Sequence, residues 1–160
     1  MTPAAPGPVL FAYDGTELAA LAIEEAAEQL EAGREALIAC VWQPANVGFL
    51  PVGGQHFDAD NSVAVREAAE ATAAHGAKLA EEAGFHASVA CAKAAPTWKG
   101  LVEVAEKHGA SMIVIGTHER HGLAGHLAGS VTRDLISHTA LPILVVRRRG
   151  TAAGHEAAPQ

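Results

Sequence analysis

The sequence predicts an α/β fold: one five-stranded parallel sheet in the order 3-2-1-4-5, with helices on both faces. The 160 residues fit a single domain, in which five short runs of apolar, β-prone residues alternate with longer segments of helical periodicity. Four of the five short runs are apolar throughout, which is typical of parallel strands buried on both faces. Right-handed crossovers then favour this strand order, with its reversal between the first and fourth strands.

The first half of the chain contains two strands and two helices by this pattern. The expected elements are a strand at 9–13, a helix that Thr16 caps and that runs to about Gly33, a strand at 36–42, and a helix from Asn61 or Ser62 to about Ala83. Residues 43–60 contain two prolines and three glycines, so we expect them to form a long irregular connection.

The second half contains three strands and two helices. The expected elements are strands at 86–92, 112–115 and 143–146, a helix from Pro96 to about His108, and a helix from Ser130 to about Thr139. A glycine-rich loop at 116–129 separates the fourth strand from the last helix. We expect residues 1–149 to form the folded domain and the Ala/Gly-rich tail, 150–160, to be disordered.

Composition argues against several classes of partner. The formal net charge is -7 and aromatic residues make up 4% of the chain, whereas nucleic acids and anionic membranes attract basic surfaces and single-stranded nucleic acid needs aromatic platforms. The basic run at 147–149 is expected to be a solvated strand end rather than a binding patch. We therefore predict no nucleic-acid partner and no membrane partner.

The cysteines and the hydropathy pattern favour a cytoplasmic protein. Cys40 and Cys91 each lie inside an apolar run, where a thiol behaves as a small hydrophobic group, and no CxxC pair occurs. Apolar runs stay well short of the roughly 20 residues of a membrane span. Residues 1–8 are short, uncharged and proline-bearing, so they are not expected to be a signal peptide.

Sheet geometry alone nominates one candidate site. Ligands of open α/β sheets bind beyond the carboxyl ends of the strands, where the strand order reverses, and this places Asp14 opposite Gly116. Glycines in the following loop permit close backbone approach, and the helix start at Gly129-Ser130 supplies unpaired N–H groups for an anion. The loop is neither a Walker A nor a dinucleotide motif. Spacing alone leaves a second interpretation open, a flexible loop followed by a capped helix.

Specific motifs at these positions resemble the universal stress protein family. They are Ala12-Tyr13-Asp14-Gly15-Thr16, Ile113-Val114-Ile115-Gly116-Thr117-His118, and Gly129-Ser130-Val131 ahead of Leu141-Pro142-Ile143-Leu144-Val145-Val146. The similarity covers about residues 8–148. It implies a Rossmann-like fold of the adenine nucleotide alpha hydrolase type, a homodimer paired through the edge strand between Ile143 and Val146, and binding of ATP or another adenine nucleotide.

The resemblance also implies roles for individual residues. Asp14 and the backbone near Ala12 and Val41 would meet the adenine and ribose, and Ile115 and Gly116 would form the floor of the pocket. Ribose and phosphates would be held by His118 and by the helix start at Gly129, Ser130 and Val131. A simpler role for Asp14, stabilising the Asp-Gly turn or capping the first helix, stays open.

One position departs from the family pattern of a Gly, two residues, a Gly, nine residues and Gly-Ser/Thr. Glu119 stands where the nucleotide-binding members have the second glycine. A carboxylate there would repel phosphates, unless Mg²⁺ bridges it to them or Arg120 supplies a counter-charge. Otherwise this chain binds ATP weakly, prefers AMP or another adenosine compound, or binds no nucleotide.

Other chemistries have less support from the residues. His118, His121 and His126 are compatible with a metal site, but the loop offers no fixed geometry, and solvated histidines are the expected state. Ser130 lacks the surroundings of a nucleophile and is expected to cap its helix. The leading hypothesis is a nucleotide-dependent sensor or adaptor without catalytic activity. Two alternatives are an interaction module whose phosphate site Glu119 closes, and a slow ATP hydrolase.

Overall fold

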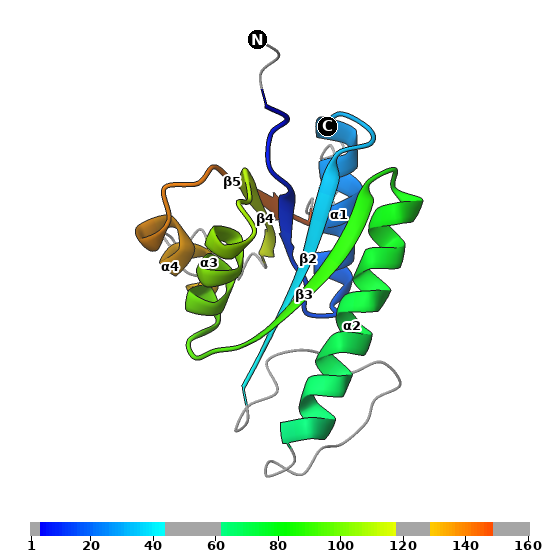
Figure 1. Ribbon diagram of the computed structural model, residues 1–160. Helices are drawn as coiled ribbons and strands as arrows, with labels where there is room; N and C mark the ends of the chain where they lie inside the picture. Colours follow the sequence, from blue (N-terminus) through cyan, green and yellow to red (C-terminus); the bar gives the residue numbers. More distant parts are fainter. Residues whose placement is uncertain (1–3, 44–61, 118–128, 149–160) are drawn as a thin grey trace, which may run out of the picture.

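A computed structural model describes residues 4–43, 62–117 and 129–148 of the chain (Figure 1). Five strands and four helices alternate in these segments. In chain order they are β1 (Val9–Ala12), α1 (Glu17–Gln29), β2 (Glu35–Trp42), α2 (Ser62–Glu82), β3 (His86–Lys93), α3 (Thr97–Lys107), β4 (Met112–Thr117), α4 (Ser130–His138) and β5 (Ile143–Arg147). The alternation predicted from the hydrophobic pattern is confirmed.

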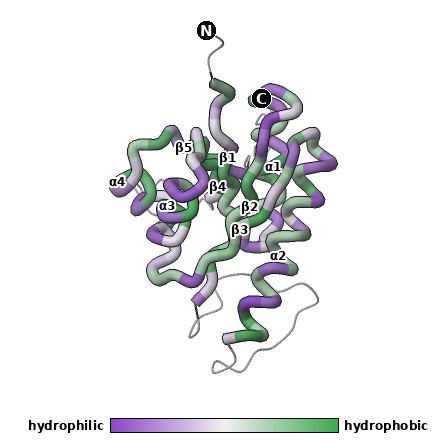
Figure 2. The backbone as a smooth tube through the Cα atoms, viewed as in Figure 1, coloured by the Kyte–Doolittle hydropathy of each residue, from purple (hydrophilic) through white to green (hydrophobic). Residues whose placement is uncertain are grey.

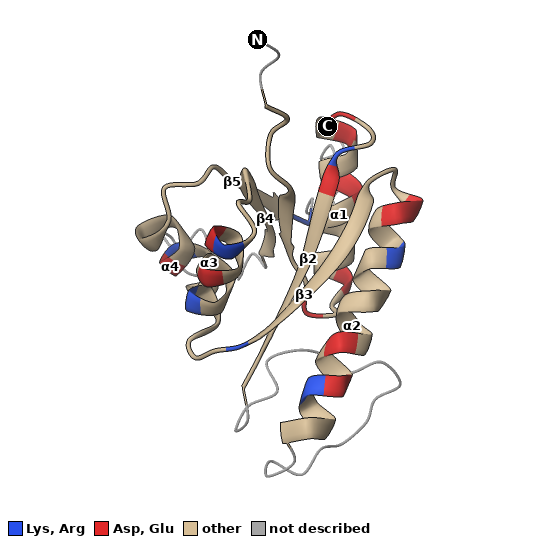
Figure 3. Cartoon of the chain, viewed as in Figure 1, with Lys and Arg blue, Asp and Glu red and all other residues tan. Residues whose placement is uncertain are grey.

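The five strands form one parallel sheet in the order β3-β2-β1-β4-β5. This is the predicted order, and β1 and β4 are the neighbours at which it reverses. Helices α1 and α2 cover one face of the sheet, and α3 and α4 cover the other (Figure 1). Charged residues occur only at strand ends, so the middle of the sheet is apolar on both faces (Figure 3).

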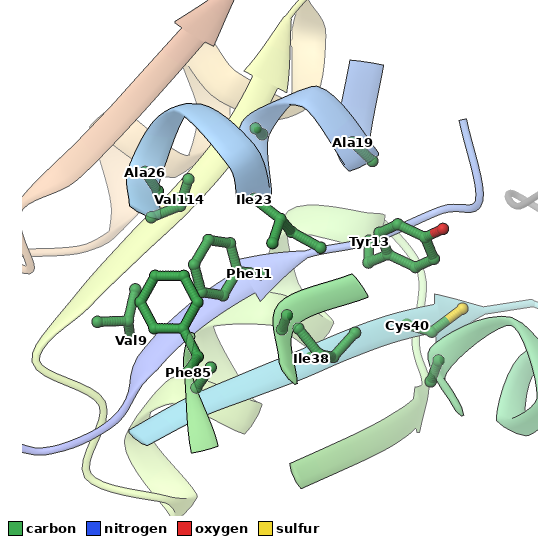
Figure 4. Close-up of a cluster of buried hydrophobic side chains, with 14 of the residues drawn as sticks. Val9, Phe11, Tyr13, Ala19, Ile23, Ala26, Ile38, Cys40, Phe85 and Val114 are labelled. Carbon is green, nitrogen blue, oxygen red and sulfur yellow. The ribbon is translucent and has the colours of Figure 1, made fainter. Parts of the chain in front are cut away.

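The core under α1 and α2 is the larger of the two and contains the aromatic residues. Phe11 of β1 and Phe85, just before β3, meet edge to face with ring centroids 5.3 Å apart (Figure 4). Ile23 of α1 and Ile38 of β2 pack into the same cluster and are almost completely buried. Gly76 lets α2 approach closely, because a Cβ there would lie 2.7 Å from the ring of Tyr13. Close packing of these side chains holds helices α1 and α2 on the sheet.

The core under α3 and α4 is aliphatic and built from smaller residues. Leu10, Leu37 and Ile113 of the strands meet Leu101 of α3 and Leu135 of α4, and each is at most 2% exposed. The sheet is hydrophobic along its strands while the helices alternate polar and apolar residues, as amphipathic surface helices do (Figure 2). Among the described residues no helix is both long and apolar enough to cross a membrane.

Two boundaries differ by two residues or more from those predicted. Helix α1 ends at Gln29 rather than near Gly33, because Leu30 is already extended and its N–H group closes the last turn on the carbonyl of Ala26. Strand β4 continues through Gly116 and Thr117, which pair with Val146 and Arg147 of β5, so the predicted loop begins two residues later. The pattern missed this extension because a Gly-Thr pair does not itself favour a strand.

Candidate functional site

Four apolar residues of the predicted site lie on the same face of the sheet. Ala12 of β1, Val41 of β2 and Ile115 of β4 come from the carboxyl ends of three neighbouring strands, and Val131 comes from the first turn of α4. All four belong to the cluster under α3 and α4. Val41 and Ile115 are buried, whereas Ala12 and Val131 are only partly covered. The structure therefore brings together residues separated by as many as 119 positions in the sequence, from Ala12 to Val131.

Helix α3 closes over Val41. A Cβ at Gly100 would lie 2.9 and 3.0 Å from the two methyl carbons of Val41, so the glycine lets the helix backbone rest directly on that side chain. The side chain of Val41 is thus packed against α3, and a contribution of this position to binding would come from its main chain.

Asp14 follows β1 at the same edge and its side chain is exposed. Its Oδ1 accepts hydrogen bonds from the backbone N–H of Thr16 at 3.1 Å and from the Thr16 hydroxyl at 2.6 Å. Thr16 in turn caps α1 by accepting from the N–H of Ala19 at 3.2 Å. Asp14 therefore stabilises the turn that leads into α1. Because its side chain is exposed, the carboxylate is also accessible to a ligand.

Gly116 points toward the opposite face. A Cβ at this position would lie 2.8 Å from the backbone oxygen of Leu18, which shows that α1 crosses β4 here with no room for a side chain. The need for glycine at this position is explained by helix-on-strand packing. Ile115 faces α3 and α4, while Gly116 faces α1.

Thr117 is a residue of the candidate site that the sequence did not single out. It is 3% exposed, and its Oγ1 accepts a hydrogen bond of 3.0 Å from the backbone N–H of Gly129. This bond joins the last residue of β4 to the residue that precedes α4, across an interval of 12 positions. The sequence does place a polar threonine directly after the glycine at a predicted strand end. Its hydrogen-bond partner could not be predicted, because the two residues are brought together only by the fold.

The start of α4 has the features of an anion site. Gly129 is the N-cap with φ -59°, and no side chain caps the helix. Ser130 is exposed and is the first residue of the helix, while Val131 and Thr132 follow in the same turn. The first amides of a helix have no partner within it and carry the positive end of its dipole. An anion with several oxygens fits such an end.

His118 and Glu119 lie outside the described residues, as do Arg120, His121 and His126. Their predicted parts in the site, and the effect of a carboxylate at 119, stay predictions. In the segments that the structure covers, no group of three or more His, Cys, Asp or Glu side chains is placed to hold a metal ion.

Three side chains with raised pKa values lie behind the site on the α1/α2 face, those of Tyr13, Cys40 and Cys91. Tyr13 shares a hydrogen bond of 2.8 Å with Nδ1 of His75, and burial, followed by the charge of Asp14, raises its pKa. Cys40 and Cys91 are direct neighbours in the register of β2 and β3, a proximity that their separation of 51 positions concealed. Burial raises the pKa of both thiols, that of Cys91 to about 11. A protonated thiol is a poor nucleophile, so the raised pKa values favour a structural role for the buried Cys40 and the partly exposed Cys91.

Comparison with known proteins identifies the family to which the chain belongs. The model of the universal stress protein family matches residues 7–147, which include every strand and helix described above. The chain belongs to the universal stress protein family. Two curated universal stress proteins of Methanocaldococcus jannaschii are similar in sequence: MJ0577, 37% identical over 51 residues, and MJ0531, 38% identical over 71 residues. These alignments span only 32% and 41% of the two relatives.

Solved structures of the family share the architecture. The structure of MJ0577 aligns with a TM-score of 0.69 over 91% of this chain and 98% of that one, at 23% identity. A universal stress protein of Archaeoglobus fulgidus in complex with dAMP aligns with a TM-score of 0.59 over 87% and 96%, at 22% identity. A universal stress protein in complex with cAMP aligns with a TM-score of 0.61 over 89% and 98%, at 19% identity. These likenesses establish the sheet order and its helical layers.

Proposed function

We propose that this universal stress protein binds an adenine nucleotide at the carboxyl edge of its sheet and acts as a nucleotide-dependent sensor or adaptor, without catalytic turnover. The observation that carries the proposal is the convergence of Ala12, Ile115 and Val131 beside the uncapped start of α4. An apolar wall next to free backbone N–H groups suits a base and sugar joined to a phosphate. Similar proteins with dAMP and cAMP bound support the class of ligand.

Each described residue has a distinct part in this proposal. The exposed carboxylate of Asp14 would accept a hydrogen bond from the ribose, and the main chain near Ala12 and Val41 would face the adenine. Ile115 and the backbone of Gly116 would form the floor of the pocket, although the position of a Gly116 Cβ faces α1. The N–H groups of α4 and the hydroxyl of Ser130 would take the phosphates. The hydrogen bond between Thr117 and Gly129 supports this arrangement, because it positions the start of α4 against β4.

Calorimetric titration of the purified protein with ATP, ADP and AMP, each with and without Mg²⁺, tests the proposal. We expect saturable binding by at least one nucleotide, weakened in Asp14→Asn and Ser130→Ala. The matched control is Ser137→Ala, since Ser137 bonds the carbonyl of Arg133 in the last turn of the same helix, away from its start. No heat with any of the three nucleotides would refute the proposed function.

Glu119 distinguishes this proposal from its main alternative, an interaction module with a closed phosphate site. If the carboxylate repels phosphates, Glu119→Gly will create or strongly increase ATP affinity. If Mg²⁺ neutralises it, the parent protein will bind Mg-ATP as tightly as the variant, and chelation of Mg²⁺ will weaken the parent more than the variant. If Arg120 neutralises it, the two proteins will bind ATP alike with and without Mg²⁺. The ratio of the two affinities, measured with and without Mg²⁺, separates these cases.

We also propose that the protein forms a homodimer through β5. β5 and β3 are the two edges of the described sheet. β5 presents three partly exposed, bulky aliphatic residues in succession, whereas β3 alternates exposed polar and small residues, Val89 apart. Aliphatic edge strands are normally paired or covered. Light scattering after gel filtration should give twice the mass of the chain, and a monomer at micromolar concentration would contradict the proposal.

The absence of turnover is a proposal with its own test. A slow ATP hydrolase is the competing activity, and it requires a general base near the γ-phosphate. Release of inorganic phosphate that co-elutes with the protein and falls in Asp14→Ala would establish hydrolysis and overturn the non-enzymatic assignment. A cytoplasmic location, expected from the sequence, is tested by fractionation of the producing cells.

A further inference from the structure

Two adjacent arginines at the end of β5 leave the sheet on opposite faces. Along β5, Val145 packs into the cluster under α3 and α4, and Val146 packs into the cluster under α1. Side chains of a strand alternate, so Arg147 emerges on the α3/α4 face. Arg148 turns to the α1 face, where its guanidinium lies 3.1 Å from the carboxylate of Glu17 at the start of α1.

Arg147 is consequently a neighbour of the α4 start. It is the register partner of Thr117 on the adjacent strand, and neighbouring strands are about 4.8 Å apart. Thr117 extends to the same face and holds the N–H of Gly129 at 3.0 Å. The exposed Arg147 side chain therefore begins one strand away from the threonine that positions the helix start, on the face where the phosphates are proposed to lie.

Charge at this edge favours the same assignment. Asp14 and Glu17 both place carboxylates at the carboxyl edge, and the chain as a whole is acidic. A polyphosphate needs a local cation in such surroundings. Arg148 pairs with Glu17 on the α1 face, and strand alternation places Arg147 on the α3/α4 face, beside the threonine that bonds to Gly129. Arginine also matches phosphate geometrically, because its planar guanidinium donates two parallel hydrogen bonds.

We propose that Arg147 is a specificity-determining residue of the nucleotide site, a counter-charge that makes the protein favour nucleotides with more phosphates. The proposal rests on the proposed function. The run at 147–149, interpreted from the sequence as a solvated strand end, then has different roles at its first two positions. Arg147 serves the ligand, and Arg148 ties the end of β5 to α1.

The pair supplies a matched experiment. ATP, AMP and adenosine are titrated into the wild type, Arg147→Ala, Arg147→Lys and Arg148→Ala at low and at physiological salt. A charge-assisted hydrogen bond corresponds to about tenfold or more in affinity. We expect Arg147→Ala to lose about tenfold or more for ATP, less for AMP and nothing for adenosine, with a smaller loss in Arg147→Lys. Arg148→Ala should bind all three ligands as the wild type does.

Other outcomes overturn the inference in distinguishable ways. Wild-type binding of ATP that Arg147→Ala retains refutes the role of Arg147 and leaves the proposed function intact. An equal loss for ATP and adenosine, or an equal loss in Arg148→Ala, indicates general damage or bulk charge and also refutes it. A wild type that binds none of the three compounds removes the proposed function and this inference together. Light scattering and thermal unfolding of each variant show whether assembly or folding has changed.

Discussion

The two faces of the sheet differ in the side chains that pack on them and in the number of predicted site residues that they contain. The α1/α2 face is covered by the longer helices and contains Phe11, Phe85 and Tyr13 in one continuous cluster (Figure 4). The buried residues of the α3/α4 face are aliphatic, with the partly buried Trp98 packed against them, and its helices have 11 and 9 residues. Four of the predicted site residues lie in the second cluster, at its carboxyl end, where Ala12 and Val131 are only partly covered.

We expect this difference to separate residues that stabilise the fold from residues that contribute to the proposed binding. Large aromatic groups bury the most surface and give the α1/α2 face its stabilising weight. The opposite face ends in the partly covered Ala12 and Val131 and in a helix start that no side chain caps, whose first N–H groups have no partner within the helix. Substitutions on the first face should therefore change the free energy of unfolding, and those at the edge of the second should change ligand affinity.

The largest expected effect is on the aromatic face. Phe11→Ala removes a ring that is 1% exposed and packs against Phe85, and it should lower the free energy of unfolding by about 3–5 kcal/mol. Urea denaturation measures the change. Ile136→Ala, at a position 59% exposed on α4, is the control and should stay within about 0.5 kcal/mol of the wild type. A loss below 1 kcal/mol for Phe11→Ala would contradict the assignment of stability to this face.

A second pair of variants compares two glycines of the family motif. Gly116→Ala places a Cβ 2.8 Å from the backbone oxygen of Leu18, and such overpacking should cost about 1–3 kcal/mol. Gly129→Ala is the control for stability, since its φ is -59° and, among the described residues, its Cβ would meet only the Thr117 Oγ1 at 3.6 Å. Thermal unfolding should show a lower midpoint for the first variant only. Equal midpoints would show that α1 can move away from β4.

A smaller effect is expected where the two functions meet, at Thr117. Thr117→Val keeps the shape of the side chain and removes the acceptor of the Gly129 N–H, which should cost about 1 kcal/mol of stability. Nucleotide affinity should fall as well, because the start of α4 loses its tie to β4. Ser137→Ala, in the last turn of α4 and away from its start, is the comparison for affinity. Unchanged affinity in Thr117→Val would mean that the bond contributes only to folding.

The smallest effect is a chemical one at Cys91. Burial, with the charge of Glu70 as the second cause, raises the pKa of this thiol to about 11, so it is protonated at pH 7–8 and becomes a thiolate only as the pH approaches 11. Alkylation by iodoacetamide should therefore be slow at pH 7.5 and accelerate past pH 10, whereas the urea-unfolded chain should react at the ordinary rate of a free cysteine. Fast alkylation of the folded protein at pH 7.5 would contradict this environment.

Most of the fold could be predicted because hydrophobic periodicity is local. The continuous apolar strands and the helical segments between them indicated a parallel sheet, and right-handed crossovers reduced the possible orders to the observed one. The boundaries were less accurate. The extension of β4 through Thr117 depends on pairing with Val146 and Arg147, which is a property of the neighbouring strand.

The candidate site could be predicted in position and only partly in detail. Asp14 and the α4 start follow from the rule that ligands bind at the reversal of strand order, and the structure places both at that edge. The bond from Gly129 to Thr117 and the register of Thr117 with Arg147 were not predicted. Both join residues at least 12 positions apart, and the hydrophobic periodicity of a sequence carries no information on such contacts.

The sequence by itself determined the fold class, the strand order and the family, because these depend on hydrophobic pattern and on motifs that are continuous in the chain. Tertiary structure decided which face each motif residue serves. Ile115 turns to the proposed site and Gly116 to α1, and Arg147 and Arg148 diverge in the same way. The physical reason is the two-residue period of a strand: adjacent residues share a sequence context but face opposite layers, and only packing of the helices assigns a role to each layer.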